Sequence, residues 1–186
     1  MISIENNKVE ELKNIIEKSD KQLIKILRKI LHIQIDKINV EKQLRLKNIS
    51  EYEFEVIKTK AKLDDGNELE IYLKPIKNSR IKESIFCYWC LIYEEELDDK
   101  NIKTEGEMAL NKVLISELTK KKYYQSVFLE IENNKGNILE TGTEINFIDI
   151  LKYIKEQDSE EDNELKEYFE GLGDYMLLVG IKVDRK

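Results

Sequence analysis

The sequence predicts a single α/β or α+β domain with a central mixed β-sheet flanked by helices. Apolar residues recur at helical spacing near the start, in the middle and near the end of the chain, and segments of alternating apolarity lie between them. The stretch "DDGN" at residues 64–67 is a strong turn signal between two alternating segments. No internal repeat or long linker divides the 186 residues, a length that suits one domain. The order helix, strands, helix, strands, helix is typical of this class.

Two helices are expected first. Residues 8–18 place Val9, Leu12, Ile15 and Ile16 on one helical face. Ser19 and Gln22 then match the capping-box pattern, which predicts a second helix that runs to about residue 33. The polar side of this second helix holds four basic residues, Lys21, Lys25, Arg28 and Lys29. We interpret that side as a solvated face, and contact with nucleic-acid phosphate is the alternative.

Three strands are expected next. Residues 35–46 alternate loosely, and the apolar set of the following segment then changes parity, which predicts a β-bulge near Val56–Ile57. Leu69, Ile71 and Leu73 alternate on the return strand, which Pro75 ends. A three-residue loop at 65–67 keeps both apolar sets on one face. That register sets Lys62 opposite Glu70, Lys60 opposite Tyr72, and Lys58 opposite Lys74.

The later elements follow the same logic. Residues 80–97 predict a helix that ends in an acidic run, Glu94, Glu95, Glu96, Asp98 and Asp99. Negative charge at a helix C-terminus opposes the macrodipole, so either the helix stops before the run or the run meets a cationic partner. Strands are expected at 109–118, 123–132 and 143–150, followed by a last helix near 165–172 and a short apolar element at 175–183.

Charge and composition restrict the classes of partner. The formal net charge is −7, of which the first 62 residues contribute +4 and the remainder −11. Tight nonspecific nucleic-acid binding is therefore disfavoured, because such proteins usually show a basic face. No apolar run is long enough for a bilayer, so we expect no membrane partner. The start of the chain lacks the pattern of a signal peptide and there are two cysteines, which together predict a cytoplasmic location.

Five blocks resemble, in order and spacing, the PD-(D/E)XK nuclease-family transposases of mobile elements, the Rpn-like group. They are "KQLIKILRKILHIQIDKINV", "IKTKAKLDDGNELEIYL", "SIFCYWCLIYEEEL", "YYQSVFLEIENN" and "ILETGTEINFIDILKY". Together they cover about residues 20–155 and leave residues 156–186 as a C-terminal helix and a short apolar element. The resemblance implies a restriction-endonuclease-like core within one domain over residues 1–186. It also implies Mg²⁺-dependent cleavage of DNA.

The sequence departs from this family at the positions that carry its chemistry. In the family, a carboxylate on the first hairpin strand and a Glu on the second hold Mg²⁺, and a Lys or Gln two residues later assists. Aligned on Ala61 and Gly66, these positions hold Lys58, Tyr72 and Lys74. An ammonium at the first position repels a divalent ion. We therefore expect no cofactor and a catalytically inactive, nuclease-like protein that binds a protein or DNA partner.

An active, Mg²⁺-dependent DNA endonuclease with displaced carboxylate ligands is the alternative. A two-residue shift places Glu70 in the Glu position and Tyr72 in the assisting position. Asp65 and Glu70 would then be the metal ligands, with Asp64 and Glu68 as further candidates. Glu55 is also available, but it precedes the change of parity in its strand. A third reading is a plain α/β domain whose resemblance to the family is accidental.

The acidic runs at 94–99 and 156–167 favour a protein partner, such as a catalytic relative or a host defence component. A DNA partner would be contacted through Lys21, Lys25, Arg28 and Lys29, or through Lys120, Lys121 and Lys122. Cys87 and Cys90 lie in the middle of a predicted helix without further ligands, which favours packing over a zinc or redox site. His32 is the single histidine, and we interpret it as a packed or half-exposed residue rather than a catalytic one.

Overall fold

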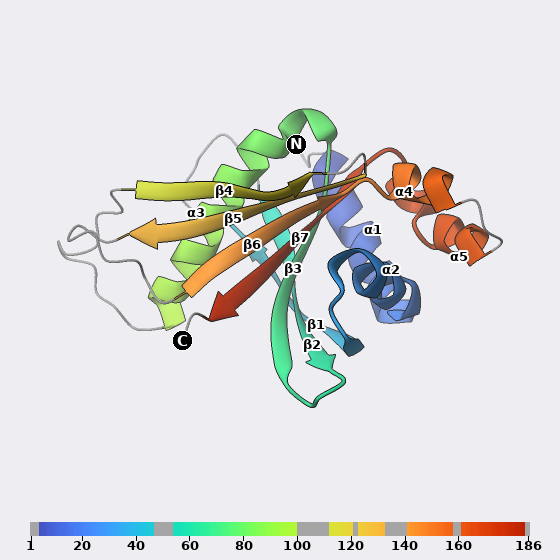
Figure 1. Ribbon diagram of the computed structural model, residues 1–186, viewed down its shortest axis with the longest axis horizontal. Helices are drawn as coiled ribbons and strands as arrows, with labels where there is room; N and C mark the ends of the chain where they lie inside the picture. The colour runs from blue at the N-terminus through green and yellow to red at the C-terminus, as the bar shows by residue number, and fades with distance from the viewer. Residues whose placement is uncertain are drawn as a thin grey trace.

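A seven-stranded β-sheet with helices on both faces forms the fold (Figure 1). The computed structural model describes residues 4–46, 54–99, 112–120, 123–132, 141–157 and 161–184. The first part of the chain contains α1 (Ile4–Lys18), α2 (Lys21–Leu31), β1 (Ile35–Arg45), β2 (Glu55–Leu63), β3 (Glu68–Ile76) and α3 (Ile81–Asp99). The second part contains β4 (Lys112–Lys120), β5 (Tyr124–Glu132), β6 (Thr141–Ile148), α4 (Ile150–Gln157), α5 (Glu161–Tyr168) and β7 (Met176–Asp184). Short 3₁₀ turns, η1 (Asn78–Arg80) and η2 (Glu170–Leu172), precede α3 and β7.

The strand order is β1-β2-β3-β7-β6-β5-β4, and all six pairings of the described sheet are antiparallel. The single α+β domain is confirmed, whereas the expected mixed sheet is wrong. The connection through α3 carries the chain from β3 to the far edge at β4, and the connection through α4 and α5 returns it antiparallel to β6. Two three-stranded meanders therefore form, β1–β3 and β4–β6, and β7 joins them.

The two faces of the sheet are covered by different helices (Figure 1). On one face, α1, α2, α4 and α5 pack over a core that includes Ile57, Ile71, Leu73, Leu177 and Val179. On the other face, α3 packs over a core that includes Val56, Tyr72, Ile145, Phe147 and Leu178. The middle of the sheet is therefore buried on both sides, as the helical layers of an α+β domain require.

This double burial explains the change of apolar parity between Val56 and Ile57. Both side chains are fully buried, one under each helical layer. The expected bulge at this point is wrong, because β2 pairs with β1 without interruption from Glu55 to Lys58 and with β3 from Ile57 to Lys62. The register shifts occur in the edge strand β1, one of them between Val40 and Lys42. Such bulges are common in edge strands.

The β2–β3 turn sets the register of the hairpin. Its loop is Asp64–Gly66, since the amide of Leu63 donates to the carbonyl of Asn67 at 2.8 Å and Gly66 takes a φ of 87°. The third loop position needs this left-handed conformation, which glycine adopts without strain. The expected loop at 65–67 was therefore one residue too late. Every predicted pair moves by two residues, and the observed pairs are Lys62 with Glu68, Lys60 with Glu70, and Lys58 with Tyr72.

Helix α3 is fixed to the centre of the sheet by Tyr88. Its hydroxyl lies 3.1 Å from Oγ1 of Thr143, and its ring meets the ring of Tyr72 edge to face at 5.9 Å. Gly180 of β7 lies directly beneath, where a Cβ would collide with the Tyr88 hydroxyl. A glycine is therefore required there for the close approach of the ring. From Tyr88, the next two turns of α3 cross β2 and β3 and bring Glu95 over Lys58.

The start of α2 differs from the expected capping box. Asp20 is the N-cap residue, and no side chain caps the helix. The Asp20 carboxylate instead accepts a hydrogen bond from the backbone amide of Ile38 at 2.8 Å. The side-chain amide of Gln22 donates a hydrogen bond to Glu164. At the other end, His32 caps α2 in the left-handed conformation, with a φ of 56°. These contacts tie α2 to β1 and α5, and they give His32 a structural position.

Candidate functional site

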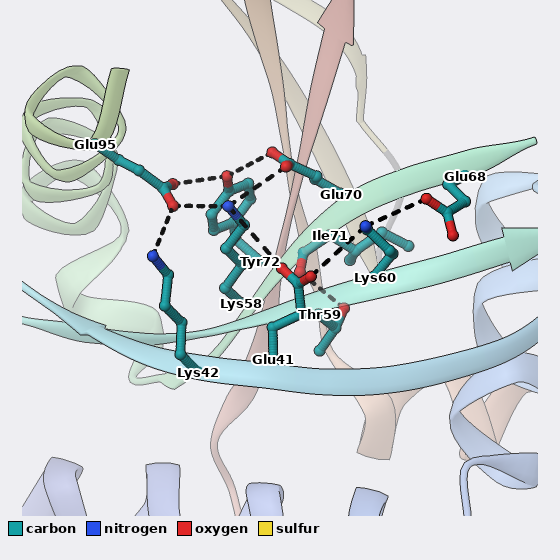
Figure 2. A network of polar contacts seen from close by, with 10 residues as sticks. All are labelled: Glu41, Lys42, Lys58, Thr59, Lys60, Glu68, Glu70, Ile71, Tyr72 and Glu95. Carbon is teal, nitrogen blue, oxygen red and sulfur yellow. Dashed lines mark hydrogen bonds and ion pairs between the residues drawn. The ribbon is translucent and has the colours of Figure 1, made fainter. Parts of the chain in front are cut away.

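A buried polar cluster lies where α3 crosses the β2–β3 hairpin (Figure 2). We call it the Lys58 cluster, and its members are Lys58 of β2, Glu70 and Tyr72 of β3, and Glu95 of α3. Lys58 and Tyr72 are direct cross-strand partners, and their side chains point to the α3 face of the sheet. Lys58 is 7% exposed and Tyr72 is fully buried. Lys58 and Tyr72, two of the predicted site residues, therefore lie under a helix.

The four side chains form a closed ring of contacts (Figure 2). The Lys58 ammonium lies 2.7 Å from Oε1 of Glu95 and 3.4 Å from Oε1 of Glu70. The Tyr72 hydroxyl lies 2.8 Å from Oε2 of Glu95 and 3.0 Å from Oε2 of Glu70. One amine and one phenol thus bridge the same two carboxylates. Because the phenol has a single proton, it donates to one carboxylate at a time.

Further charged groups surround the ring (Figure 2). Glu41, the residue at the β1 register shift, has a carboxylate oxygen 4.0 Å from the Lys58 ammonium. Lys42 lies 3.6 Å from Glu95, and Lys60 lies 3.2 Å from Glu68 and 3.8 Å from Glu41. Lys42 and Lys60 are partly exposed, so solvent screens their pairs more than the pair of Lys58 and Glu95.

The charges of the ring stabilise one another. Burial acts to lower the pKa of Lys58, but the hydrogen bond and charge of Glu95, together with Glu70, outweigh it and raise that pKa above its ordinary value. Burial acts to raise the pKa of Glu70, but the hydrogen bond from Tyr72 and the charge of Lys58 hold it below its ordinary value. Both shifts favour the ionised forms, as expected for opposite charges in contact.

The phenol of Tyr72 stays protonated. Burial, followed by the negative charges of Glu95 and Glu70, raises its pKa far above that of a free tyrosine. A general base must lose its proton near the working pH, and both Lys58 and Tyr72 hold theirs more tightly than usual. Glu70 is ionised and has its oxygens committed to Lys58 and Tyr72. The arrangement is therefore suited to holding α3 on the hairpin rather than to moving a proton.

The donor set of the Lys58 cluster does not fit Mg²⁺. Three carboxylates, Glu41, Glu70 and Glu95, lie within 4.0 Å of the same ammonium, which already supplies their counter-charge. A divalent ion at this point would be repelled by the ammonium. Within the described ranges, no three Asp, Glu, His or Cys residues are grouped so as to hold a metal ion.

Two candidate residues lie away from the cluster. Lys74 does not face Lys58. It is 1% exposed, pairs with Leu178 of β7, and has its ammonium 4.9 Å from the ring centroid of Phe54. Glu55 is paired with Arg45 at 3.6 Å, and its strand position puts it on the face opposite Lys58. The structure therefore brings Lys58, Tyr72 and Glu70 together, and it separates Lys74 and Glu55 from them.

The candidates near the turn have structural contacts. Asp64 accepts a hydrogen bond from the Arg28 guanidinium at 2.9 Å, which joins the turn to α2. The Asp65 carboxylate accepts from the backbone and side-chain amides of Asn67, which hold its pKa below the ordinary value. Glu70 lies three residues along β3 from Asn67, roughly 10 Å at the rise of a strand. Asp65 and Glu70 are thus not placed to share one metal ion.

The basic residues expected to contact DNA belong to two alternative sets, one on α2 and one at the end of β4. Arg28 is committed within the fold, since it also donates to the carbonyl of Ile35 at 2.8 Å. Lys21, Lys25 and Lys29 share α2 with it. Lys120 ends β4, whereas Lys121 and Lys122 lie outside the described residues.

Sequence reasoning missed Glu95 and Glu41. For Glu95, a signal was available, because it follows Tyr88 and Leu91 by seven and four residues and so shares their helical face. The acidic run was expected to stop the helix or to need a cation. One of its residues finds that cation in Lys58, and α3 continues to Asp99. Glu41 gave no signal, since its position depends on a register shift in β1.

Comparison of the chain with protein-family models, with curated proteins and with solved structures finds no match. In the described part of the chain, no helix combines the length and apolarity needed to cross a bilayer.

Proposed function

We propose that this chain is a nuclease-like protein without metal-dependent catalysis that acts by binding a protein partner. The observation that supports this proposal is the Lys58 ammonium, which lies 2.7 Å from Glu95 at the position where the family's first metal-binding carboxylate would stand. The second family position holds the Tyr72 phenol in place of a carboxylate. Likeness to the nuclease family, including a restriction-endonuclease-like core, rests on the order of sequence blocks over residues 20–155.

A protein partner is favoured over DNA by charge. The formal net charge of −7 repels a polyanion, and Arg28, the arginine among the candidate DNA contacts, is used to join α2 to the hairpin. The cluster itself is closed by α3 and offers no donor fork to a phosphate. We therefore expect the protein partner to be bound through surface shape and apolar contact.

Calorimetric titration with Mg²⁺ and Mn²⁺, together with a plasmid-nicking assay, tests the proposal. We expect no heat of binding and no nicking at millimolar metal. Lys58→Ala, which leaves Glu41, Glu70 and Glu95 without their ammonium, should gain Mn²⁺ binding, because the carboxylates then lack a counter-charge. Lys60→Ala is the matched control, since it removes a partly exposed amine on the same strand and should leave the titration unchanged.

The opposite result has a clear form. Cleavage by the natural chain that depends on Mg²⁺ and disappears in Glu70→Ala, but persists in Glu68→Ala, would establish the endonuclease with displaced ligands and exclude the proposal.

A further inference from the structure

The outward side of α3 carries a second apolar line, which we call the outer stripe. It begins with Phe86 and Cys90, and the helix continues the line through positions 93 and 97, where the sequence has Tyr and Leu. The line that faces the sheet is a different one, with Tyr88, Leu91 and Glu95. A helix packed on one side only would have polar residues along its outer side.

The exposure of Phe86 is unusual among the described residues of this chain. Phe86 is 56% exposed, and Leu151 of α4, at 39%, is the other large apolar side chain exposed among the residues whose burial is described. The half-buried Trp89 lies beside the stripe, with its ring 6.3 Å from the ring of Phe86. An exposed aromatic ring beside a second, half-buried one is typical of interaction surfaces.

The spacing of the stripe is that of a helix–helix contact. Residues 86, 90, 93 and 97 are separated by four, three and four positions. This is the seam of a helix that packs lengthwise on another helix. The stripe therefore fits a helical partner better than a loop or a small molecule.

The charges at the two ends of α3 indicate which helix. Three exposed basic residues, Lys77, Arg80 and Lys82, lie at or just before its N-terminal end, and the acidic run lies at its C-terminal end. Apart from Glu83 in the first turn, which pairs with Arg80 at 3.9 Å, both groups oppose the helix macrodipole. A second α3 laid antiparallel would bring each basic end beside an acidic end. A parallel arrangement would instead bring like charges together.

We propose that the outer stripe of α3 is a self-association surface on which a second copy of the chain packs its own α3 antiparallel. This contact is isologous, so a two-fold axis crosses the middle of the stripe. The Cys90 residues of the two copies then lie near that axis. A helix of this length is roughly 28 Å long at the standard rise. The contact is therefore small, and we expect a dissociation constant in the micromolar range.

The surface is independent of the function proposed above, because the Lys58 cluster lies on the opposite side of α3. Failure of the dimer leaves the metal titration unaffected, and metal binding by the natural chain leaves the dimer unaffected.

Sedimentation equilibrium of the full chain over concentrations up to about 100 µM, a range matched to micromolar affinity, is the first test. We expect a monomer–dimer equilibrium that Phe86→Glu weakens at least about tenfold, since the charge falls on an apolar seam. Leu151→Glu is the matched control, because it places the same charge on the other exposed apolar residue and should leave the equilibrium unchanged. Circular dichroism confirms that each variant is folded.

Oxidative cross-linking with a copper–phenanthroline reagent is the second test, and it needs no destabilising substitution. The reagent oxidises two thiols to one disulfide. We expect a covalent dimer that Cys90→Ser abolishes and Cys87→Ser retains, because Cys87 is buried towards the sheet. A chain that stays monomeric at the highest concentration, or a dimer indifferent to both Phe86→Glu and Cys90→Ser, would overturn the proposal and leave the stripe to a different protein.

Discussion

The two faces of the β2–β3 hairpin both carry buried residues but differ in chemistry. Towards α1 and α2, the fully buried residues Ile57, Ile71 and Leu73 pack among aliphatic side chains. Towards α3, Lys58 and Tyr72 are buried in contact with Glu95, and Lys74 is buried with its ammonium over the ring of Phe54. The apolar face gains stability from the area removed from water, without regard to direction. The polar face gains little net stability and instead specifies which residue of α3 stands over which residue of the hairpin.

Helix α3 contacts the sheet at two points, through Tyr88 at its middle and through Glu95 towards its C-terminal end. Tyr88 anchors the middle of α3 to Thr143 and Gly180, and it determines how closely the helix approaches. The contact of Glu95 with Lys58, seven residues later, determines its direction across the strands. Three substitutions or conditions separate these contributions.

The apolar face should give the largest loss of stability. Leu73→Ala removes a fully buried side chain and leaves a cavity, so we expect the free energy of unfolding to fall by about 2–5 kcal/mol. Urea denaturation followed by circular dichroism measures the loss. Leu151→Ala, at the exposed side of α4, is the control and should change it by less than about 0.5 kcal/mol. Equal losses at both positions would mean that the apolar face is not the main core.

Substitutions on the polar face should lower the free energy of unfolding by leaving a buried charge without its partner, rather than by reducing the buried apolar area. Lys58→Met leaves Glu95 and Glu70 without their ammonium, and we expect a loss of about 3 kcal/mol. Adding Glu95→Leu to Lys58→Met removes the uncompensated charge, so the double variant should recover much of that loss. A double-mutant cycle measured by urea denaturation gives the coupling. Strict additivity of the two substitutions would show that the pair does not interact.

The pH dependence should be the smallest effect. The pKa of Glu70 is lowered in the fold, so its contribution is present above about 4.5, the ordinary value, and is lost as the pH falls through the lowered one. The pKa of Lys58 is raised, so its contribution is present below 10.5 and is lost as the pH rises through the raised value. We expect the urea midpoint to fall at both the acidic and the alkaline end.

Lys58→Met serves as the control for this measurement. It should reduce the acidic fall, since Glu70 then lacks the charge that lowers its pKa, and reduce the alkaline fall, of which the raised pKa of Tyr72 leaves a part in place. An alkaline fall that is the same in the natural chain and in Lys58→Met would mean that another group titrates there.

The sequence was sufficient for the local elements and insufficient for their long-range arrangement. Helical spacing located α1, α2 and α3, and alternation located β2 and β3, because both periods are local properties of the chain. The register failed by two residues because the loop was counted without requiring Gly66 to hold the positive φ. The change of parity at Val56 was read as a bulge because a period of two cannot distinguish a bulge from burial on both faces.

The candidate site was predictable in part for the same reason. Lys58 and Tyr72 were selected from the hairpin alone, and their pairing follows from its turn. Glu95 and Glu41 depend on how α3 lies across the sheet and on a shift in β1, which are non-local. The expected mixed sheet failed because the position of β7 depends on pairing with two distant strands.

The position of β7 between the two meanders also determines the order of events in folding. Ile76 of β3 pairs with Met176 of β7, about 100 residues further along the chain. Each meander can form early from residues that are close in sequence. Docking of β7 closes a long loop first, which costs more conformational entropy. Until it docks, β3 and β6 both present unpaired backbone, the kind of edge on which chains aggregate. We therefore expect refolding to be slow and sensitive to protein concentration, with β7 as the last strand to become protected from hydrogen exchange.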